Sequence, residues 1–136
     1  MSAKRKLAYE ILIIISAVLA DNLVITNLNW LLGLYEIPLW IGFTLTVFIG
    51  VFMINSFNLI DGIDGLAGSV GLLSSLIFSY LFYDLELFAL VTLSISLAGA
   101  LLGFLKFNYS DKNKIFMGDT GSLLVGFLLS FFSVKF

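Results

Sequence analysis

Residues 37–57 read I-P-L-W-I-G-F-T-L-T-V-F-I-G-V-F-M-I-N-S-F, a stretch of apolar and small side chains without a single charge. About 20 such residues in a helix, each rising about 1.5 Å, are long enough to cross the hydrocarbon core of a bilayer. The stretch therefore predicts a membrane-spanning helix and places the chain among membrane proteins.

The composition extends this prediction to the whole chain. Of the 136 residues, 60% are hydrophobic and only 12% are charged, about half the ~25% that is usual for soluble domains. The mean hydropathy is +1.10, which is more apolar surface than one soluble core of this size can bury. Four further apolar runs lie at Leu7–Ala20, Leu66–Tyr83, Leu87–Phe107 and Ser122–Val134. We therefore expect an all-α polytopic membrane protein with about five transmembrane helices.

The basic residues predict the orientation of these spans. With the N-terminus in the cytoplasm, five spans place six of the seven Lys and Arg residues in cytoplasmic segments, and only Lys135 falls outside. The segments Asn55–Gly65 and Asn108–Thr120 are then both cytoplasmic loops of a multi-pass plasma-membrane protein. The outer segment Asp21–Glu36 alternates partly in polarity and contains Gly33, which predicts a short periplasmic or extracellular β-hairpin.

The composition also narrows the function. The chain contains no Cys and no His, so its own residues offer neither a thiolate nor a histidine general base. The net charge of −2 gives no indication of a nucleic-acid partner. Gly99 and Gly103 form a G-x-x-x-G pattern, which permits close contact between helices. We expect that contact within the chain, and the pattern leaves a homodimer open.

The first cytoplasmic loop carries a regular series of polar residues. It reads N-S-F-N-L-I-D-G-I-D-G-L from position 55, so that amides and carboxylates recur every three residues, at Asn55, Asn58, Asp61 and Asp64. On a 3₁₀ turn these four share one face, whereas on an α-helix the spacing drifts by about 60° per step. A carboxylate costs roughly 2.5–3.5 kcal/mol at the centre of a bilayer and less at its surface. The loop therefore suggests a functional site, and solvated Asp-Gly turns are the alternative.

The second cytoplasmic loop reads K-F-N-Y-S-D-K-N-K-I-F-M-G-D-T-G-S-L from position 106. Asp119 stands at the start of the last apolar run, where a carboxylate can bind a hard cation such as Mg²⁺. Free amides at the N-terminus of that helix, near Gly118, can receive phosphate oxygens. Lys112 and Lys114 add positive charge for an anionic substrate. The alternatives are that Asp119 caps the helix and that the lysines only mark the cytoplasmic side.

Together the loops predict a metal-dependent site for a phosphorylated substrate at the inner surface of the membrane. Phosphoryl transfer depends mostly on positioning and charge neutralisation, for which carboxylates, amides and lysines suffice. A lipid co-substrate would explain why such a site lies at a bilayer. An ion-coupled transporter segment is an alternative, but it predicts acidic residues in the middle of spans rather than at their ends. A non-catalytic polytopic membrane protein leaves the series of Asn and Asp-Gly residues unexplained.

Both motifs resemble those of one enzyme family. N-S-F-N-L-I-D-G-I-D-G-L-A-G followed by I-F-M-G-D-T-G-S-L is similar to the polyprenyl-phosphate N-acetylhexosamine-1-phosphate transferases. The motifs occur in the family's order, and the likeness covers residues 1–136 as one partial membrane-embedded transferase domain, the middle portion of the family's domain. The stretch G-L-Y-E-I-P resembles the branch that transfers GlcNAc-1-phosphate.

The resemblance implies a reaction and roles for individual residues. A UDP-N-acetylhexosamine, here UDP-GlcNAc, donates its sugar-1-phosphate to undecaprenyl phosphate, and UMP is released, with Mg²⁺ as cofactor, in cell-envelope polysaccharide synthesis. By motif position, Asp119 is the metal ligand and shares the catalytic site with Asp61 and Asp64. Phe116 is implied to stack on the uracil ring. The complete set implied to bind substrate is Asn55, Asn58, Lys114, Phe116 and Gly118.

The chain departs from the family pattern in three ways. Family members carry an adjacent Asp pair in an earlier cytoplasmic loop and a His-rich loop further on, and this chain has neither an Asp-Asp pair nor a His. The Pro-Ala that often precedes Lys-Ile-Phe in the family is replaced here by the residues Y-S-D-K-N at positions 109–113. We therefore expect a fragment with an incomplete bundle and without independent activity. The different second loop leaves the roles of Lys112 and Lys114 open.

Overall fold

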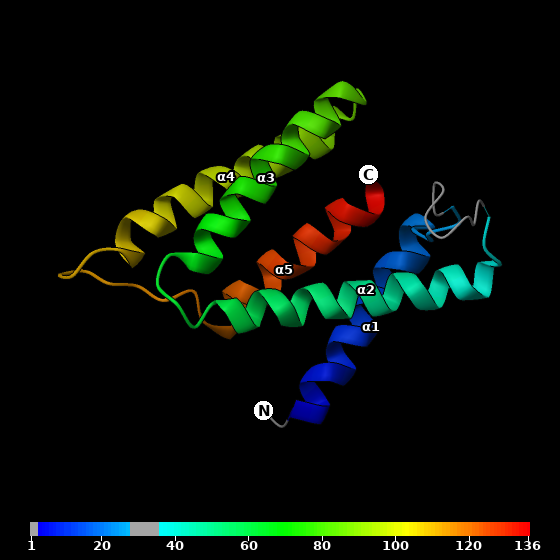
Figure 1. Ribbon diagram of the computed structural model, residues 1–136, viewed down its shortest axis with the longest axis horizontal. Helices are drawn as coiled ribbons and strands as arrows, with labels where there is room; N and C mark the ends of the chain where they lie inside the picture. The colour runs from blue at the N-terminus through cyan, green and yellow to red at the C-terminus, as the bar shows by residue number, and fades with distance from the viewer. Residues whose placement is uncertain (1–2, 28–35) are drawn as a thin grey trace.

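Five α-helices build this computed structural model, which describes residues 3–27 and 36–136, the side chains of Ala3 and Asp21 excepted. Each apolar run of the sequence coincides with one helix, so the all-α prediction is confirmed for the described residues. Three helices, α2, α3 and α4, are long and apolar enough to cross a membrane, and the count of five spans stays a prediction. In chain order the helices are α1 (Ala3–Asp21), α2 (Leu39–Ile60), α3 (Leu66–Asp84), α4 (Phe88–Asn108) and α5 (Gly118–Lys135) (Figure 1).

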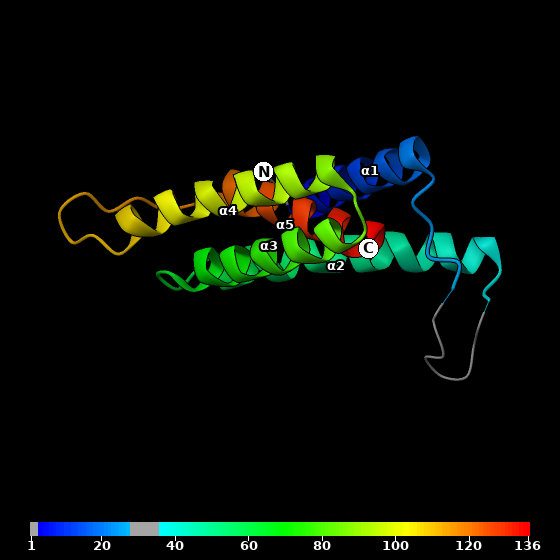
Figure 2. The same ribbon diagram turned by 90° about the horizontal axis from the view of Figure 1, so that it is seen from above.

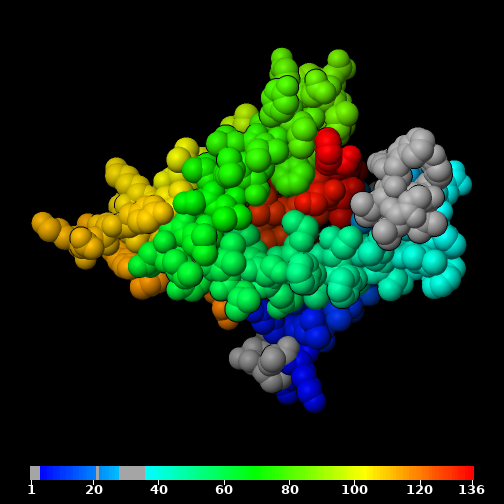
Figure 3. Space-filling view, in the orientation of Figure 1, coloured from blue at the N-terminus to red at the C-terminus, as the bar shows by residue number. Residues whose placement is uncertain are grey.

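Helix α5 occupies the centre of the bundle. Helices α3 and α4 run side by side as an antiparallel pair, α1 crosses α2, and α5 packs against both α2 and α3 (Figures 1 and 2). In the space-filling view, α5 lies in a recess between α3 and α2 (Figure 3). The last helix therefore connects the α1–α2 pair to the α3–α4 pair.

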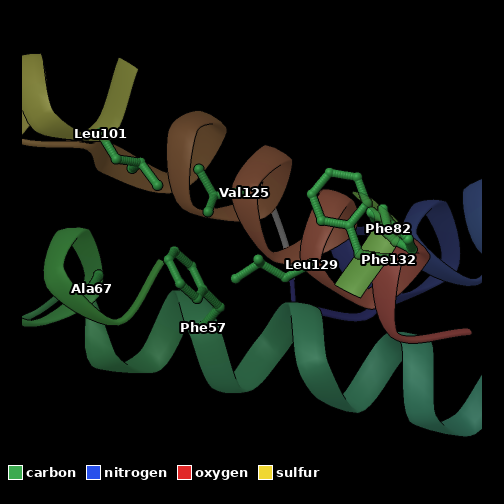
Figure 4. Packing of buried hydrophobic residues seen from close by; sticks show 7 residues of the cluster. All are labelled: Phe57, Ala67, Phe82, Leu101, Val125, Leu129 and Phe132. Atoms are coloured by element: carbon green, nitrogen blue, oxygen red, sulfur yellow. The ribbon is translucent and has the colours of Figure 1, made fainter. Parts of the chain in front are cut away.

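Two apolar clusters surround α5. In the larger one, the buried rings of Phe82 and Phe132 meet edge-on with their centroids 5.6 Å apart, a geometry that aromatic pairs prefer. The smaller cluster joins Ile14 and Val18 of α1 to Ile54 of α2. Figure 4 shows how side chains of α2, α3, α4 and α5 converge in the larger cluster, which consists of Phe57, Ala67, Phe82, Leu101, Val125, Leu129 and Phe132.

Gly126 allows α5 to approach α2 closely. A Cβ atom at this position would lie 3.0 Å from Ile54 Cα and 3.2 Å from Phe57 Cβ. Both distances are shorter than ordinary van der Waals contacts between carbon atoms. The absence of a side chain at Gly126 therefore sets the spacing between these two helices.

The G-x-x-x-G pattern of α4 makes no such contact. A Cβ atom at Gly99 or Gly103 would meet nothing within 4 Å, and both residues are exposed. Helix α4 instead buries the side that carries Ala98 and Leu101. The expected close contact at these glycines is therefore wrong within the described residues, because α4 turns a different face toward its neighbours.

Large apolar side chains cover the outside of the bundle. On α2 alone, Trp40, Phe48 and Phe52 are 72%, 65% and 62% exposed. Exposed apolar surface on this scale marks contact with a membrane or another apolar surface. Together with the three long apolar helices, it agrees with a multi-pass membrane protein.

The predicted β-hairpin falls mainly on residues 28–35, which lie outside the described residues. At its edges, Asn27 and Glu36 form an isolated antiparallel bridge. The N–H of Ile37 also donates a hydrogen bond to the carbonyl of Thr26 at 3.1 Å. Because the described residues contain no strand, the hairpin stays a prediction.

Candidate active site

The two polar loops lie at the same end of the bundle, where α2 and α4 end and α3 and α5 begin (Figures 1 and 2). Asn58 Nδ2 donates a hydrogen bond to Asp119 Oδ1 at 3.3 Å, across 61 residues of sequence. Lys114 of the second loop forms an ion pair with Asp64 of the first. The predicted site residues of both motifs are therefore brought together.

The four polar residues of the first motif do not share one face. Helix α2 continues as an α-helix to Ile60, so the drift of about 60° per step applies to Asn55 and Asn58. Asp61 and Asp64 lie beyond the helix in a turn region, so the four residues do not form one continuous 3₁₀ segment. Each residue consequently has a different partner. In order along the chain, Asn55 bonds to Glu10, Asn58 to Lys6, Asp119 and Ser122, Asp61 to Gly118, and Asp64 to Lys114.

Asp61 and Asp119 form the acidic centre of the site. The carboxylate of Asp61, just beyond the end of α2, accepts a hydrogen bond from the N–H of Gly118 at the first residue of α5. Burial raises the pKa of Asp61 above its ordinary value of 3.8, the Gly118 N–H lowers this pKa, and the charge of Asp119 raises it. Two neighbouring carboxylates that repel each other are suited to hold a divalent cation between them.

The side chains at this centre fit an open magnesium site. Within residues 3–27 and 36–136, no group of three or more His, Cys, Asp and Glu side chains could enclose a metal ion. Mg²⁺ usually binds through one or two carboxylates and completes its shell with water and substrate phosphates. Asp61 and Asp119 could supply such a pair. Asp119 lies in the first turn of α5 rather than capping it, because the N-cap position is Met117.

The second loop presents a cation and an aromatic ring together. Lys114 Nζ lies 5.6 Å from the centroid of the Phe116 ring, within the range of a cation–π contact. The Phe116 side chain is 74% exposed, so its ring is open to a planar ligand. Lys112 is exposed in the same loop. The arrangement can offer stacking and positive charge to one ligand.

A buried asparagine outside the predicted site residues clamps the two loops. Asn108, the last residue of α4, is 4% exposed and accepts a hydrogen bond from the Gly65 N–H at 2.6 Å. Its Nδ2 donates to the carbonyl of Ile115 at 2.8 Å. Gly65 has a φ of +73°, a conformation that favours glycine. The only sequence signal for this clamp is an amide directly after an apolar run.

Helix α1 also contributes two side chains that were not among the predicted site residues. Lys6 Nζ donates to Asn58 Oδ1 at 2.6 Å. One turn further along, the buried Glu10 accepts a hydrogen bond from Asn55 Nδ2 at 2.6 Å. A spacing of four residues places Lys6 and Glu10 on the same face of the helix. This spacing is the sequence signal for a shared polar face, because Lys6 by itself indicates only a basic N-terminal segment.

An apolar groove of about 350 Å³ runs between α1, α2 and α5. Lys6 and Glu10 line it together with apolar side chains, and Lys6 also bonds to Asn58 beside Asp119. The groove therefore joins an apolar surface to the acidic centre. Its apolar lining consists of Tyr9, Ile13, Ile54, Leu123, Leu124 and Phe127.

A comparison with known protein families covers all of these residues. Residues 1–136, the whole chain, match the family model described as Glycosyl transferase family 4. The chain belongs to glycosyl transferase family 4. The resemblance to the polyprenyl-phosphate N-acetylhexosamine-1-phosphate transferases is thereby confirmed, and the family is one of transferases. No solved structure matches this family 4 chain.

Relatives of this family 4 chain carry the names of phosphotransferases. It is 40% identical over 106 residues to a phospho-N-acetylmuramoyl-pentapeptide-transferase of Streptococcus mutans, covering 76% of the chain and 31% of the relative. It is 45% identical over 94 residues to a protein of the same name from Clostridium perfringens, covering 69% and 27%. Identity is 42% over 93 residues to a decaprenyl-phosphate N-acetylglucosaminephosphotransferase of Mycolicibacterium smegmatis, covering 62% and 23%. The chain thus spans less than a third of the length of these relatives.

Proposed function

We propose that this chain supplies part of the active site of an enzyme that transfers GlcNAc-1-phosphate from UDP-GlcNAc to undecaprenyl phosphate and releases UMP. The reaction would serve the synthesis of cell-envelope polysaccharide. The observation that carries the proposal is the convergence of the two loops, in which Asn58 bonds to Asp119, Lys114 pairs with Asp64, and the charge of Asp119 acts on Asp61. A diphosphate substrate needs such a centre to hold the cation that binds its oxygens.

In this proposal, each loop has a distinct role toward the nucleotide sugar. Asp61 and Asp119 hold Mg²⁺, which when bound neutralises charge on the diphosphate. Asp64 is the third carboxylate of the site. Its ion-pair partner Lys114 would supply positive charge to a phosphate. The exposed ring of Phe116 stacks on the uracil. Asn55, Asn58 and Gly118 complete the substrate-binding set.

In this proposal, the groove between α1, α2 and α5 binds the lipid acceptor. Its lining is apolar except at Lys6 and Glu10, and an ammonium group beside an apolar groove suits an anionic head group with a hydrocarbon chain. Undecaprenyl phosphate has this chemistry. The proposal places both loops and the N-terminus on the cytoplasmic side of the plasma membrane, as the distribution of basic residues favours.

The names of the relatives suggest a second candidate for the donor. Two of the proteins described above are named for the transfer of phospho-N-acetylmuramoyl-pentapeptide, and one is named for N-acetylglucosamine phosphate. UDP-N-acetylmuramoyl-pentapeptide is therefore the alternative donor for the same chemistry. Assays of UMP release that offer each donor separately distinguish the two.

Substitution of Asp119 tests the proposed function. In a longer chain that carries these segments, Asp119→Asn should reduce Mg²⁺-dependent UMP release by more than about a hundredfold, because a metal ligand is lost. In the chain itself, reconstituted in lipid nanodiscs, the same substitution should abolish Mn²⁺ binding measured by electron paramagnetic resonance. The control is Asp111→Asn, an exposed carboxylate of the same loop. Unchanged UMP release and Mn²⁺ binding in Asp119→Asn would refute the assigned role.

A further inference from the structure

The hydrogen bonds of Asn58 define which way its side-chain amide points. Lys6 Nζ donates to Oδ1 at 2.6 Å, so the amide oxygen is directed toward α1. Nδ2 then donates to Ser122 Oγ at 2.7 Å and to Asp119 Oδ1 at 3.3 Å. An ammonium group has only donors, and a carboxylate has only acceptors. The observed orientation therefore satisfies both neighbours.

The opposite orientation would satisfy neither neighbour. It would direct Nδ2 of Asn58 at the Lys6 ammonium, which places donor against donor, and Oδ1 at Asp119, which places acceptor against acceptor. Lys6 thus holds the amide of Asn58 in the one orientation that supports Asp119. The hydrogen bond to Asp119 Oδ1 leaves Oδ2 available for a cation. Hydrogen bonds to ligating carboxylates strengthen metal sites in this way.

A second hydrogen bond fixes the position of Lys6. Glu10, one turn further along α1, accepts a hydrogen bond from Asn55 Nδ2 at 2.6 Å, and Asn55 itself is anchored to the carbonyl of Val51 at 2.9 Å. The Glu10 side chain is only 5% exposed. Lys6 and Glu10 therefore form two parallel connections from one face of α1 to the last turns of α2. These connections keep α1 from sliding along α2.

We propose that Lys6 is a positioning residue of the phosphotransfer site, acting through the amide of Asn58 on Asp119. This inference rests on the proposed function, in which Asp119 holds the metal. Lys6 has two properties that the sequence alone does not distinguish. One is its charge, which marks the cytoplasmic side of the membrane, and the other is its hydrogen bond, which orients Asn58.

Substitutions at position 6 can remove the two properties separately. Lys6→Gln removes the charge and keeps an N–H group that can donate to Asn58 Oδ1, whereas Lys6→Met removes both. Lys4→Met removes one charge from an exposed residue of the same helix and serves as the matched control. Each variant is reconstituted in nanodiscs, and its affinity for Mn²⁺ is measured by electron paramagnetic resonance.

We expect the affinity for Mn²⁺ to depend on the orientation of the Asn58 amide rather than on the charge at position 6. We expect Lys6→Met to weaken Mn²⁺ binding about tenfold, as the loss of an outer-shell partner does. Lys6→Gln should stay within about twofold of the unsubstituted chain, as should Lys4→Met. Equal changes in Lys6→Met and Lys6→Gln would show that only the charge matters and would overturn the inference. No change in Lys6→Met would overturn it as well.

A second measurement reports on Asn58 without a metal. The side-chain amide of Asn58 is observed by ¹⁵N nuclear magnetic resonance and assigned by its loss in Asn58→Ser. Its resonance should move in Lys6→Met and stay near its place in Lys6→Gln. Resonances that stay unmoved in Lys6→Met refute the inference whatever the manganese result. Absence of Mn²⁺ binding by the unsubstituted chain counts against the proposed function instead.

Discussion

The loop end of the bundle and the interior of its helices are held together in different ways. Within the helices, hydroxyl groups mostly donate to backbone carbonyls one turn earlier, as Ser75 does to Gly71. Thr46 Oγ1 likewise donates to the Gly42 carbonyl and also accepts a hydrogen bond from the Ile25 N–H. At the loop end, side chains of different elements bond to one another, in the pairs Lys6–Asn58, Glu10–Asn55, Asn58–Asp119, Asn58–Ser122 and Asp64–Lys114.

This difference shows which forces determine each region. Lipid tails are as apolar as the helix surfaces, so helices in a bilayer associate through close packing and small residues. Such contacts are individually weak and add up over many atoms. A buried polar pair is different, because removing one partner leaves the other unsatisfied. Single substitutions should therefore have their largest effects on the buried polar connections.

The largest expected effect is that of Asn108→Ala. The substitution leaves the Gly65 N–H and the Ile115 carbonyl without their hydrogen bonds, and we expect a loss of about 2–3 kcal/mol in the free energy of unfolding. Unfolding in detergent micelles with increasing denaturant, followed by circular dichroism, measures this change. Asn113→Ala, at an exposed position of the same loop, should change stability by less than about 0.5 kcal/mol. Equal effects of the two substitutions would contradict the assigned clamp.

A smaller effect is expected from close packing in the interior. In Gly126→Ala, the new methyl group lies 3.0 Å from Ile54 Cα, and overpacking should cost about 1–2 kcal/mol. Gly99→Ala places the same methyl group in open space, where the better helix propensity of alanine should stabilise the chain by about 0.5–1 kcal/mol. The two substitutions should therefore change the unfolding midpoint in opposite directions. Changes of the same sign would show that the α2–α5 spacing is not limiting.

The smallest expected effect concerns the pH dependence at Asp61. Because burial raises the pKa of this carboxyl group, its stabilising contribution is fully present below pH 3.8 and is lost as the pH rises through the raised pKa. Asp61→Asn removes this loss, so its stability relative to the unsubstituted chain should increase as the pH rises through that window. Denaturant unfolding at several pH values, with metal ions chelated, measures the difference. A difference that does not vary with pH would contradict the raised pKa.

The apolar pattern made the helices and the common location of the two loops predictable. Uninterrupted apolar runs locate the helices, and the count of helices between the loops places both at one end. The series Asn55, Asn58, Asp61 and Asp64 identified the candidate site because polar residues rarely recur at regular spacing beside a span. The partner of each of these residues depends on how far α2 continues as a helix. Helix α2 ends at Ile60.

The contributions of α1 and α4 were not predictable because they depend on the packing of helices. Lys6 resembles any basic residue near a cytoplasmic terminus, and its partner Asn58 lies 52 residues away. The role of Asn108 becomes visible only in the structure, where its side chain bonds to the Gly65 N–H and to the Ile115 carbonyl. The glycines of α4 show the converse, since a sequence pattern for close contact faces open space within the described residues.

Helix α5 spans the distance between the loop end of the bundle and its aromatic interior. It has 18 residues, and about 20 Å separates Asp119 from Phe132 along a helix with a rise of 1.5 Å per residue. Phe132 is wedged among the rings of Phe78 and Phe82. One continuous helix therefore joins the aromatic cluster around Phe82 to Asp119. We expect a cavity made near Phe82 to loosen the end of α5 that lies opposite Asp119.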